Sequence, residues 1–157
     1  MMGNGARESV NIRRMTVDDI PAVLVVEQDV FTMPWTEHAF VNELVKNPFA
    51  HYFVLEIDAQ IVGYGGVWLV MQEAHITNFA IHSSLQRHGY GEQLFQEVLE
   101  TAKRYDTRKM TLEVRTSNTA AQRLYEKFGF VKTGIEKGYY TDTKEDAFVM
   151  TLEMEPS

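Results

Sequence analysis

Gln86-Arg87-His88-Gly89-Tyr90-Gly91 is the stretch of sequence that decides the fold. It follows a run over residues 73–82 that mixes apolar residues on both faces, as a central strand covered on both sides does. After it, one helical face collects the apolar residues Tyr90, Leu94, Phe95, Val98, Leu99, Ala102 and Tyr105. The sequence therefore predicts a strand, a glycine loop and a long amphipathic helix in succession.

The start of such a helix favours an anion as ligand. Its first main-chain N–H groups lack partners, and the helix dipole adds about half a positive charge there. Gly89 and Gly91 let a ligand approach the main chain closely, and Arg87 and His88 add side-chain donors. A phosphate or pyrophosphate is therefore the ligand expected at this loop.

Two other phosphate-binding motifs are excluded by the residues after Gly91. A Rossmann fingerprint needs a glycine where Leu94 stands, and a P-loop needs Lys-Ser or Lys-Thr where Glu92-Gln93 stands. From spacing alone, a loop that only turns the chain is an equally good interpretation, because short glycine pairs are common.

The segments on both sides of this loop follow strand and helix periodicities in turn. Before it, the sequence predicts a strand over residues 10–15, a helix capped by Thr16 and ended by Pro34, a helix from Thr36 to Lys46, and strands over 51–57 and 61–71. After the long helix, it predicts a strand over 109–115, a helix from Asn118 to Gly129, and strands over 130–136 and 147–153 around a Gly138-Tyr139-Tyr140 loop. This order indicates an α+β (mixed α/β) fold with a mostly antiparallel sheet and helices on both faces.

The composition describes one ordinary globular domain. The chain has 157 residues, of which 45% are apolar and 24% charged. We expect a single domain over residues 10–157 behind a flexible N-terminus of residues 1–9. The absence of cysteine excludes a disulfide scaffold, a thiolate metal site and a cysteine nucleophile. The five histidines show no ligand spacing, so no metal is expected.

The charge balance bears on the kind of partner. Lys and Arg number 15 and Asp and Glu 22, which gives a formal net charge of −7. An acidic chain is poorly suited to nucleic acid, which needs clustered positive charge, and suits a basic partner better. The sequence shows neither a signal peptide nor an apolar run that could span a membrane, so a cytoplasmic protein without a membrane partner is expected.

Three polar side chains in the second half are candidates for function, and each also has a plainer interpretation. Glu113 alternates with apolar strand neighbours, which is compatible with a solvated glutamate or with a general base. Asn118 is suited to cap a helix, and a cap leaves its amide donors free. Tyr125 lies on the apolar stripe of its helix and can be a core aromatic, although a buried hydroxyl requires a partner.

The glycine loop together with these segments resembles a known family. Gln86-x-x-Gly89-x-Gly91 after a strand is similar to the acyl-CoA pyrophosphate loop of the GCN5-related N-acetyltransferase (GNAT) superfamily. Five further segments, in order, resemble the ribosomal-protein-alanine N-acetyltransferases of that family: Phe31-Thr32-Met33-Pro34-Trp35-Thr36, Ile76-Thr77-Asn78-Phe79-Ala80-Ile81, Leu112-Glu113-Val114-Arg115-Thr116-Ser117-Asn118, Leu124-Tyr125-Glu126-Lys127-Phe128-Gly129-Phe130, and Gly138-Tyr139-Tyr140 with Glu145-Asp146-Ala147. The resemblance spans about Val10 to Leu152 and implies a GNAT fold with a twisted sheet of about seven strands.

The resemblance implies acetyl-CoA as cofactor. Asn78, Phe79, Ala80 and Ile81 would lie along the pantetheine arm and bond it through the main chain. The pyrophosphate would be held by Gln86, Arg87, His88, Gly89, Tyr90 and Gly91. Asn118 would lie near the thioester end.

The resemblance also implies catalytic roles. Glu113 would be the general base that deprotonates an arriving ammonium, and Tyr125 would protonate the departing CoA thiolate. Because the chain has no cysteine to carry an acyl group, direct attack in a ternary complex is the economical mechanism. Trp35, Tyr139 and Tyr140 would border the slot for a protein N-terminus.

The implied substrate is the N-terminal alanine of small-subunit ribosomal protein eighteen, a basic partner. Two alternatives stay open at this stage. A related GNAT enzyme could acetylate other protein N-termini or a small amine, since loops and not the fold separate these activities. A non-catalytic acyl-CoA-binding module would keep the glycine loop but would not need Glu113 and Tyr125, whose joint presence argues against it.

Overall fold

A computed structural model describes residues 9–155 of the chain. Its helices and strands follow one another as β2 (Val10–Arg14), a 3-10 turn (Val17–Asp19), α1 (Ile20–Val30), α2 (Glu37–Lys46), β3 (Ala50–Ile57), β4 (Gln60–Val70), β5 (Glu73–Ile81), a 3-10 turn (Ser83–Leu85), α3 (Tyr90–Arg104), β6 (Lys109–Arg115), α4 (Thr119–Lys127), β7 (Val131–Tyr140) and β8 (Glu145–Glu153). The predicted flexible segment over residues 1–9 lies outside the described residues except for Ser9. The N–H of Asp58 donates to the carbonyl of Ser9 at 2.9 Å, and the N–H of Ser9 donates to the side chain of Asp58 at 3.0 Å.

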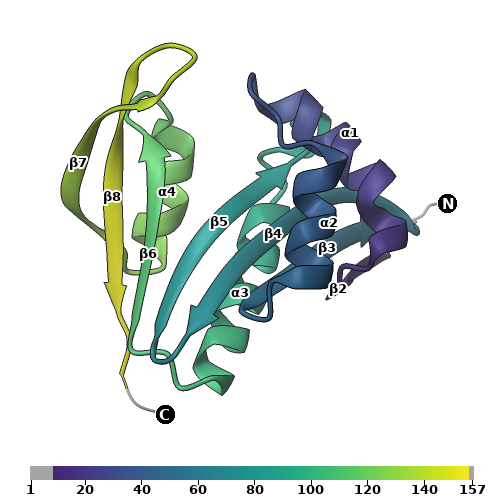
Figure 1. Ribbon diagram of the computed structural model, residues 1–157, viewed down its shortest axis with the longest axis horizontal. Coiled ribbons are helices and arrows are strands. Elements are labelled where there is room, and N and C mark those ends of the chain that lie inside the picture. The colour runs from purple at the N-terminus through teal and green to yellow at the C-terminus, as the bar shows by residue number, and fades with distance from the viewer. Residues whose placement is uncertain (1–8, 156–157) are drawn as a thin grey trace, which may run out of the picture.

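The strands form one sheet in the order β2-β3-β4-β5-β6-β8-β7 (Figure 1). Every neighbouring pair is antiparallel except β5 and β6, which run parallel. The predicted α+β fold with a mostly antiparallel sheet of about seven strands is confirmed. In the described part of the chain, no helix is both long and apolar enough to cross a lipid bilayer.

Helices cover both faces of the sheet, as strand alternation in β3 shows most simply. Tyr52 and Val54 belong to the apolar cluster that α1 and α2 complete, while Phe53 and Leu55 belong to the cluster of α3 and α4. Both clusters are buried, and Val54 and Leu55 are each 0% exposed. The sheet is therefore the middle layer of three.

Strands β5 and β6 separate along their length. They pair only where Glu73, Ala74 and His75 meet Lys109, Met110 and Thr111. Figure 1 shows the two strands together at one end of the sheet and apart at the other. On the other side of β5, the register with β4 shifts between Gly66 and Val67. The divergence opens a gap in the centre of the sheet. Each of the two strands stays paired with its other neighbour, β5 with β4 and β6 with β8.

Local capping follows the predictions at three positions. Thr36 accepts a hydrogen bond from the N–H of Ala39, which starts α2. Asn118 accepts one from the N–H of Ala121, which starts α4. Gly129 ends α4 with a φ of +100°, a conformation that side chains disfavour.

Two predicted boundaries are wrong. The first helix ends at Val30 and not at Pro34, because Phe31 is already extended with φ −111° and ψ 139°. Tyr139 and Tyr140 were expected in a loop but lie in β7, which runs four residues past the predicted end at residue 136. An irregular register between Glu136 and Tyr140, with Gly138 at φ +59°, lets the strand continue through the glycine.

Candidate active site

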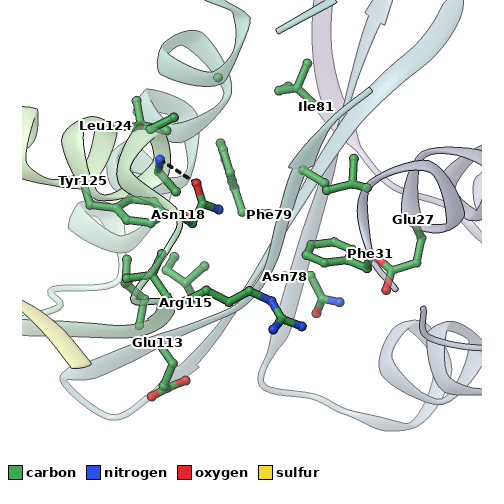
Figure 2. Close-up of a pocket in the computed structure, with 18 of the residues that line it drawn as sticks. Glu27, Phe31, Asn78, Phe79, Ile81, Glu113, Arg115, Asn118, Leu124 and Tyr125 are labelled. Atoms are coloured by element: carbon green, nitrogen blue, oxygen red, sulfur yellow. Dashed lines mark hydrogen bonds between the residues drawn. The ribbon is translucent and has the colours of Figure 1, made fainter. Parts of the chain in front are cut away.

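A pocket of about 740 Å³ occupies the gap between β5 and β6 (Figure 2). Fourteen of the sixteen residues predicted for the site line it: Trp35, Asn78, Phe79, Ala80, Ile81, Gln86, Arg87, Gly89, Gly91, Glu113, Asn118, Tyr125, Tyr139 and Tyr140. The fold thus brings segments from the first helix to the last hairpin to one cavity.

One side of the pocket is the edge of β5. Asn78 and Ala80 pair with Gly66 and Tyr64 of β4, while the pairing of β5 with β6 has already ended at His75. The main chain beyond His75 therefore has polar groups on the pocket side that a ligand can bond as a neighbouring strand would. The side chains are fixed by packing, and the ring of Phe79 lies 5.4 Å from that of Phe95.

The glycine loop continues this side of the pocket. The side-chain amide of Gln86 donates to the carbonyl of Ile81 at 3.1 Å, which holds the loop against the end of β5. Arg87 and Gly89 both adopt positive φ, +69° and +81°. A Cβ on Gly89 would meet no atom of the described residues within 4 Å, so the main chain there is open to a ligand. Because no side chain from residues 9–155 caps the start of α3, its positive end is left for an anion.

Two predicted residues of the loop lie outside the pocket lining. Tyr90 is 9% exposed and belongs to the core beneath α3. His88 stacks on Tyr90 with ring centres 5.9 Å apart. Tyr90 heads the apolar stripe of the helix, so its side chain turns inward while its main chain belongs to the loop.

Glu113 lies on β6 at the end of the pocket where the strands begin to separate (Figure 2). Its neighbours Leu112 and Val114 are buried, and the glutamate side chain is 19% exposed on the other face. Its Oε1 lies 2.7 Å from Nε2 of His75 and accepts from the hydroxyl of Tyr139 at 3.4 Å. Within the described residues, Oε2 has no hydrogen-bond partner and is free to meet a ligand.

Tyr125 lies on α4 and places a hydroxyl in the same pocket. Its ring packs on Phe95 and Phe130 at centroid distances of 5.3 and 6.0 Å, and the residue is 7% exposed. Burial raises the pKa of the Tyr125 hydroxyl, which therefore stays protonated at neutral pH. This hydroxyl forms no hydrogen bond with any described residue, so it can donate to a ligand.

Asn118 stands between these groups at the start of α4 and lines the pocket. Its side-chain oxygen accepts the N–H of Ala121 at 3.1 Å. The amide N–H groups of Asn118 remain as donors, as the capping geometry requires. The capping interpretation is confirmed, and it leaves the amide able to bond a ligand as well.

The loop after α1 is held by a buried carboxyl that the sequence reasoning missed. Glu27 is 2% exposed, accepts the N–H of Trp35 at 2.8 Å, and receives the hydroxyl of Tyr64 on its other oxygen. Burial raises the pKa of Glu27. The signal was present in the sequence, because Glu27 stands seven residues after Ile20 on the apolar stripe of its helix.

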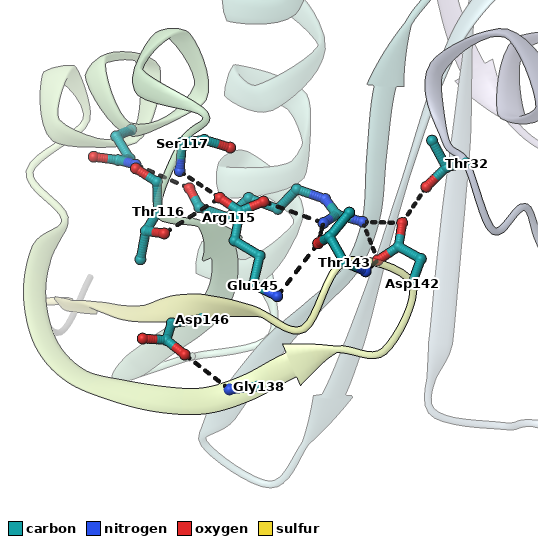
Figure 3. Close-up of polar contacts among 10 residues, drawn as sticks. Thr32, Arg115, Thr116, Ser117, Gly138, Asp142, Thr143, Glu145 and Asp146 are labelled. Carbon is teal, nitrogen blue, oxygen red and sulfur yellow. Dashed lines mark hydrogen bonds and ion pairs between the residues drawn. The ribbon is translucent and has the colours of Figure 1, made fainter.

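A second missed group crosses the mouth of the pocket (Figure 3). Arg115 forms ion pairs with Asp142 at 2.9 Å and Glu145 at 3.3 Å, and its guanidinium lies 4.0 Å from the ring centre of Tyr140. Asp142 also accepts the hydroxyl of Thr32 from the loop after α1. The hydrogen bond from Thr32, followed by that from Arg115, lowers the pKa of Asp142 to about 2. These contacts connect the two sides of the molecule over the pocket.

No group of three or more metal-ligating side chains occurs among residues 9–155. The groups in the pocket that can meet a ligand include the carboxylate of Glu113, the protonated phenol of Tyr125, the amide of Asn118 and the open main-chain edge of β5. Such a set can bind a phosphate-containing ligand along β5 and move protons at its other end.

Comparison with known proteins agrees with this arrangement. The model of the Acetyltransferase (GNAT) family matches residues 20–130. A protein of Bacillus subtilis, provisionally named a ribosomal protein bS18-alanine N-acetyltransferase, is 48% identical over 88% of this chain and 92% of its own length. The ribosomal protein bS18-alanine N-acetyltransferase of Escherichia coli (strain K12) is 32% identical over 90% and 95%.

The crystal structure of the ribosomal-protein-S18-alanine N-acetyltransferase from Escherichia coli superposes with a TM-score of 0.87. The sequence identity in that superposition is 30%, and it covers 95% of this chain and 96% of the other. The likeness therefore extends over the whole three-layer fold, including both strands that border the pocket.

Proposed function

This chain belongs to the acetyltransferase (GNAT) family and is an acetyl-CoA-dependent N-acetyltransferase, and we propose that its substrate is the N-terminal alanine of ribosomal protein bS18. The N-acetyltransferase activity follows from membership of the family. The substrate is proposed from the two bS18-alanine relatives, which match this chain over more than nine-tenths of their own lengths.

The chemistry of the pocket suits acetyl-CoA. We propose that the unpaired edge of β5, from Asn78 to Ile81, bonds the pantetheine arm as an added strand would. The open main chain at Gly89 and the uncapped start of α3 would hold the pyrophosphate, with Arg87 as a side-chain donor. Bound in this way, acetyl-CoA supplies the acetyl group as a thioester.

Glu113 is proposed to prepare the nucleophile. An α-amino group has a pKa near 8 and arrives largely as an ammonium, which cannot attack a carbonyl. The free Oε2 of Glu113 faces no protein partner among the described residues and can take that proton, directly or through a water molecule. The main contribution of the remaining pocket is positioning, with a main-chain N–H of β5 available to the thioester oxygen.

Tyr125 is proposed to supply the proton that the departing sulfur needs. Its buried and protonated hydroxyl has no acceptor in the described part of the chain, so it is available as a donor. The nitrogen loses two protons as the C–N bond forms and the C–S bond breaks. One proton leaves through Glu113 to solvent, and the other restores the proton that Tyr125 gives to sulfur, so the balance closes.

The observation that carries this mechanism is that one cavity holds the free carboxylate oxygen of Glu113, the free hydroxyl of Tyr125 and the open edge of β5. On the substrate side, Trp35, Tyr139 and Tyr140 border the same cavity. Glu113 and Asp142 are acidic groups that line the cavity, and they suit the basic tail of a ribosomal protein. Since ribosomal proteins are made in the cytoplasm, we propose that the enzyme acts there.

Intact-mass measurement of purified bS18 after incubation with acetyl-CoA and the enzyme tests the proposal. We expect one acetyl group per bS18, located on the N-terminal alanine, and none on bS18 whose N-terminus is blocked beforehand. A parallel set of peptides with other N-terminal residues and of small amines serves as competitor. Faster turnover of those compounds, with bS18 unchanged, would replace the proposed substrate. Binding of acetyl-CoA without any turnover would reduce the protein to a binding module.

A further inference from the structure

His75 makes the closest side-chain contact with Glu113. Its Nε2 lies 2.7 Å from Oε1, while Oε2 of the same carboxylate has no partner among the described residues. The two residues come from the parallel pair β5 and β6 at the last register position before the strands separate, where His75 faces Thr111. Glu113 follows Thr111 by two residues and so lies on the same face of the sheet.

The pair spans the boundary between pocket and solvent. Glu113 lines the pocket, whereas His75 stands just before the first lining residue of β5, Ile76. The side chain of His75 is 37% exposed and that of Glu113 is 19% exposed. The imidazole therefore approaches the carboxylate from the solvent side and leaves the pocket side of Glu113 open.

We infer that His75 is the positioning residue for Glu113: its Nε2–H holds Oε1, so that Oε2 is the oxygen that takes the proton of the substrate amine. This inference rests on the proposed role of Glu113 as general base. With Glu113 ionised, a neutral imidazole must carry its proton on Nε2 to make a favourable contact at this distance. The carboxylate is then fixed at one oxygen and available at the other.

The other groups around the pair hold Glu113 less closely. From β7, the hydroxyl of Tyr139 reaches the same Oε1 at 3.4 Å, and burial with the nearby Glu113 raises the pKa of Tyr139, so it stays protonated. From β4, the ring of Trp68 packs on His75 at 6.1 Å, and its indole N–H donates to Glu43 of α2.

Tyr140 of β7 also stays protonated, because burial raises its pKa to about 12. The charge of Glu136 on β7 also raises the pKa of Tyr139. Arg115 of β6 forms ion pairs with Asp142 and Glu145, and its guanidinium lies over the ring of Tyr140. The imidazole is thus the side chain that makes the short hydrogen bond with Glu113, at 2.7 Å.

The test compares His75→Ala with His75→Gln in the full-length enzyme, using an alanine-terminated peptide and saturating acetyl-CoA. Alanine removes the donor, so we expect kcat to fall about tenfold, a fraction of the roughly 10²–10⁴-fold that a general base contributes. Glutamine keeps an N–H donor, so we expect kcat within about twofold of wild type.

His38→Gln is the matched control, because His38 is exposed on α2, and it should leave kcat unchanged. Wild-type kcat in His75→Ala overturns the inference. So does a His75→Gln variant as slow as His75→Ala.

A third variant separates this inference from the proposed function. If Glu113→Gln turns over like wild type, the assignment of the base fails before His75 is considered. If Glu113→Gln is slow, adding His75→Ala to it should cause no further loss, because His75 acts through that carboxylate. A further loss of about tenfold in the double variant would show that His75 acts independently and would overturn the inference while leaving the base intact.

Discussion

The two sides of the pocket are built in different ways. On the β5 side, the ligand-facing groups are main chain, and the loop that completes them is held by contacts between near neighbours, such as Gln86 to Ile81. On the side of the β7–β8 hairpin (the hairpin side), the groups are side chains from distant segments. There the hydroxyl of Thr32 donates a hydrogen bond to Asp142, which is 110 residues away in the sequence. A main-chain site depends on backbone shape, so one short motif specifies it. A side-chain site depends on how elements pack, and no short motif contains that information.

The difference predicts that substitutions on the two sides change different kinetic constants. Changes at the β5 side should weaken acetyl-CoA binding and leave the affinity for the peptide nearly unchanged. Changes at the hairpin side should do the reverse. The residues that meet the reacting atoms should alter turnover more than either affinity.

The largest effect is expected from Glu113→Gln. Loss of the base should lower kcat by about 100-fold at neutral pH, within the range measured for general bases. The deficit should shrink as pH rises above about 8, where the amine loses its proton without help. Steady-state rates over pH give the result, with acetyl-CoA affinity from calorimetry as the control. A pH–rate profile parallel to that of wild type would exclude Glu113 as the base.

Tyr125→Phe should come next. Removing the proton donor for the leaving sulfur should slow the chemical step by about 30-fold, less than loss of the base, because water can replace the donor in part. Pre-steady-state measurement of thiol release separates this step from binding. The ring contacts with Phe95 and Phe130 survive the change, so the melting temperature serves as a control. Release of thiol at the wild-type rate would leave Tyr125 with a packing role only.

Gly89→Val tests the main-chain side alone. Gly89 has a φ of +81°, a conformation that costs a residue with a Cβ about 1–2 kcal/mol. The valine variant should therefore change the conformation of the loop, and we expect its affinity for acetyl-CoA to fall by about tenfold. The peptide KM should stay close to wild type. Gly134→Val on the exposed strand β7 is the control, because a Cβ at that position would lie 3.8 Å from its nearest neighbour, an ordinary contact. Unchanged affinity in calorimetry would contradict the assignment of the loop to the pyrophosphate.

Asp142→Asn should have the smallest effect. The substitution weakens the contacts of this side chain with Arg115 and Thr32. We expect the peptide KM to rise by about threefold, the size expected for ionic contacts near the surface. The affinity for acetyl-CoA should not change. The folded pKa of Asp142, about 2, lies below its ordinary 3.8. The stability it contributes is therefore complete above pH 3.8 and is lost as pH falls toward 2.

Thermal unfolding of the Asp142→Asn variant beside wild type checks this sign. The variant should melt lower near neutral pH, and the gap should close in acid. Asp18→Asn, at an exposed position of the turn before α1, should show no such gap. A gap that widens in acid would contradict the direction of the pKa shift.

The sequence predicted those parts of the molecule that are specified locally. The caps at Thr36 and Asn118 and the end of α4 at Gly129 were recognisable because each depends on residues within one turn. The alternation around Glu113 placed its side chain on the open face of β6 for the same reason. Periodicity alone did not predict that these residues belong to one site. That prediction came from the resemblance to a family.

The parts that were missed depend on packing between distant elements. Tyr139 and Tyr140 were placed in a loop because Gly138 is a typical turn residue, yet a glycine at φ +59° can also sit in an irregular strand. Nothing near Arg115 in the sequence marks Asp142 as its partner. The contact of His75 with Glu113 requires knowing that β5 and β6 are parallel and in which register.

A crystal structure of the enzyme with CoA and an alanine-terminated peptide tests the central claim most directly. We expect pantetheine along Asn78–Ile81 and pyrophosphate on the loop from Arg87 to Gly91. The sulfur should lie beside the hydroxyl of Tyr125, and the peptide amine beside Oε2 of Glu113. A coenzyme bound outside the gap between β5 and β6, or a sulfur remote from both side chains, would contradict it.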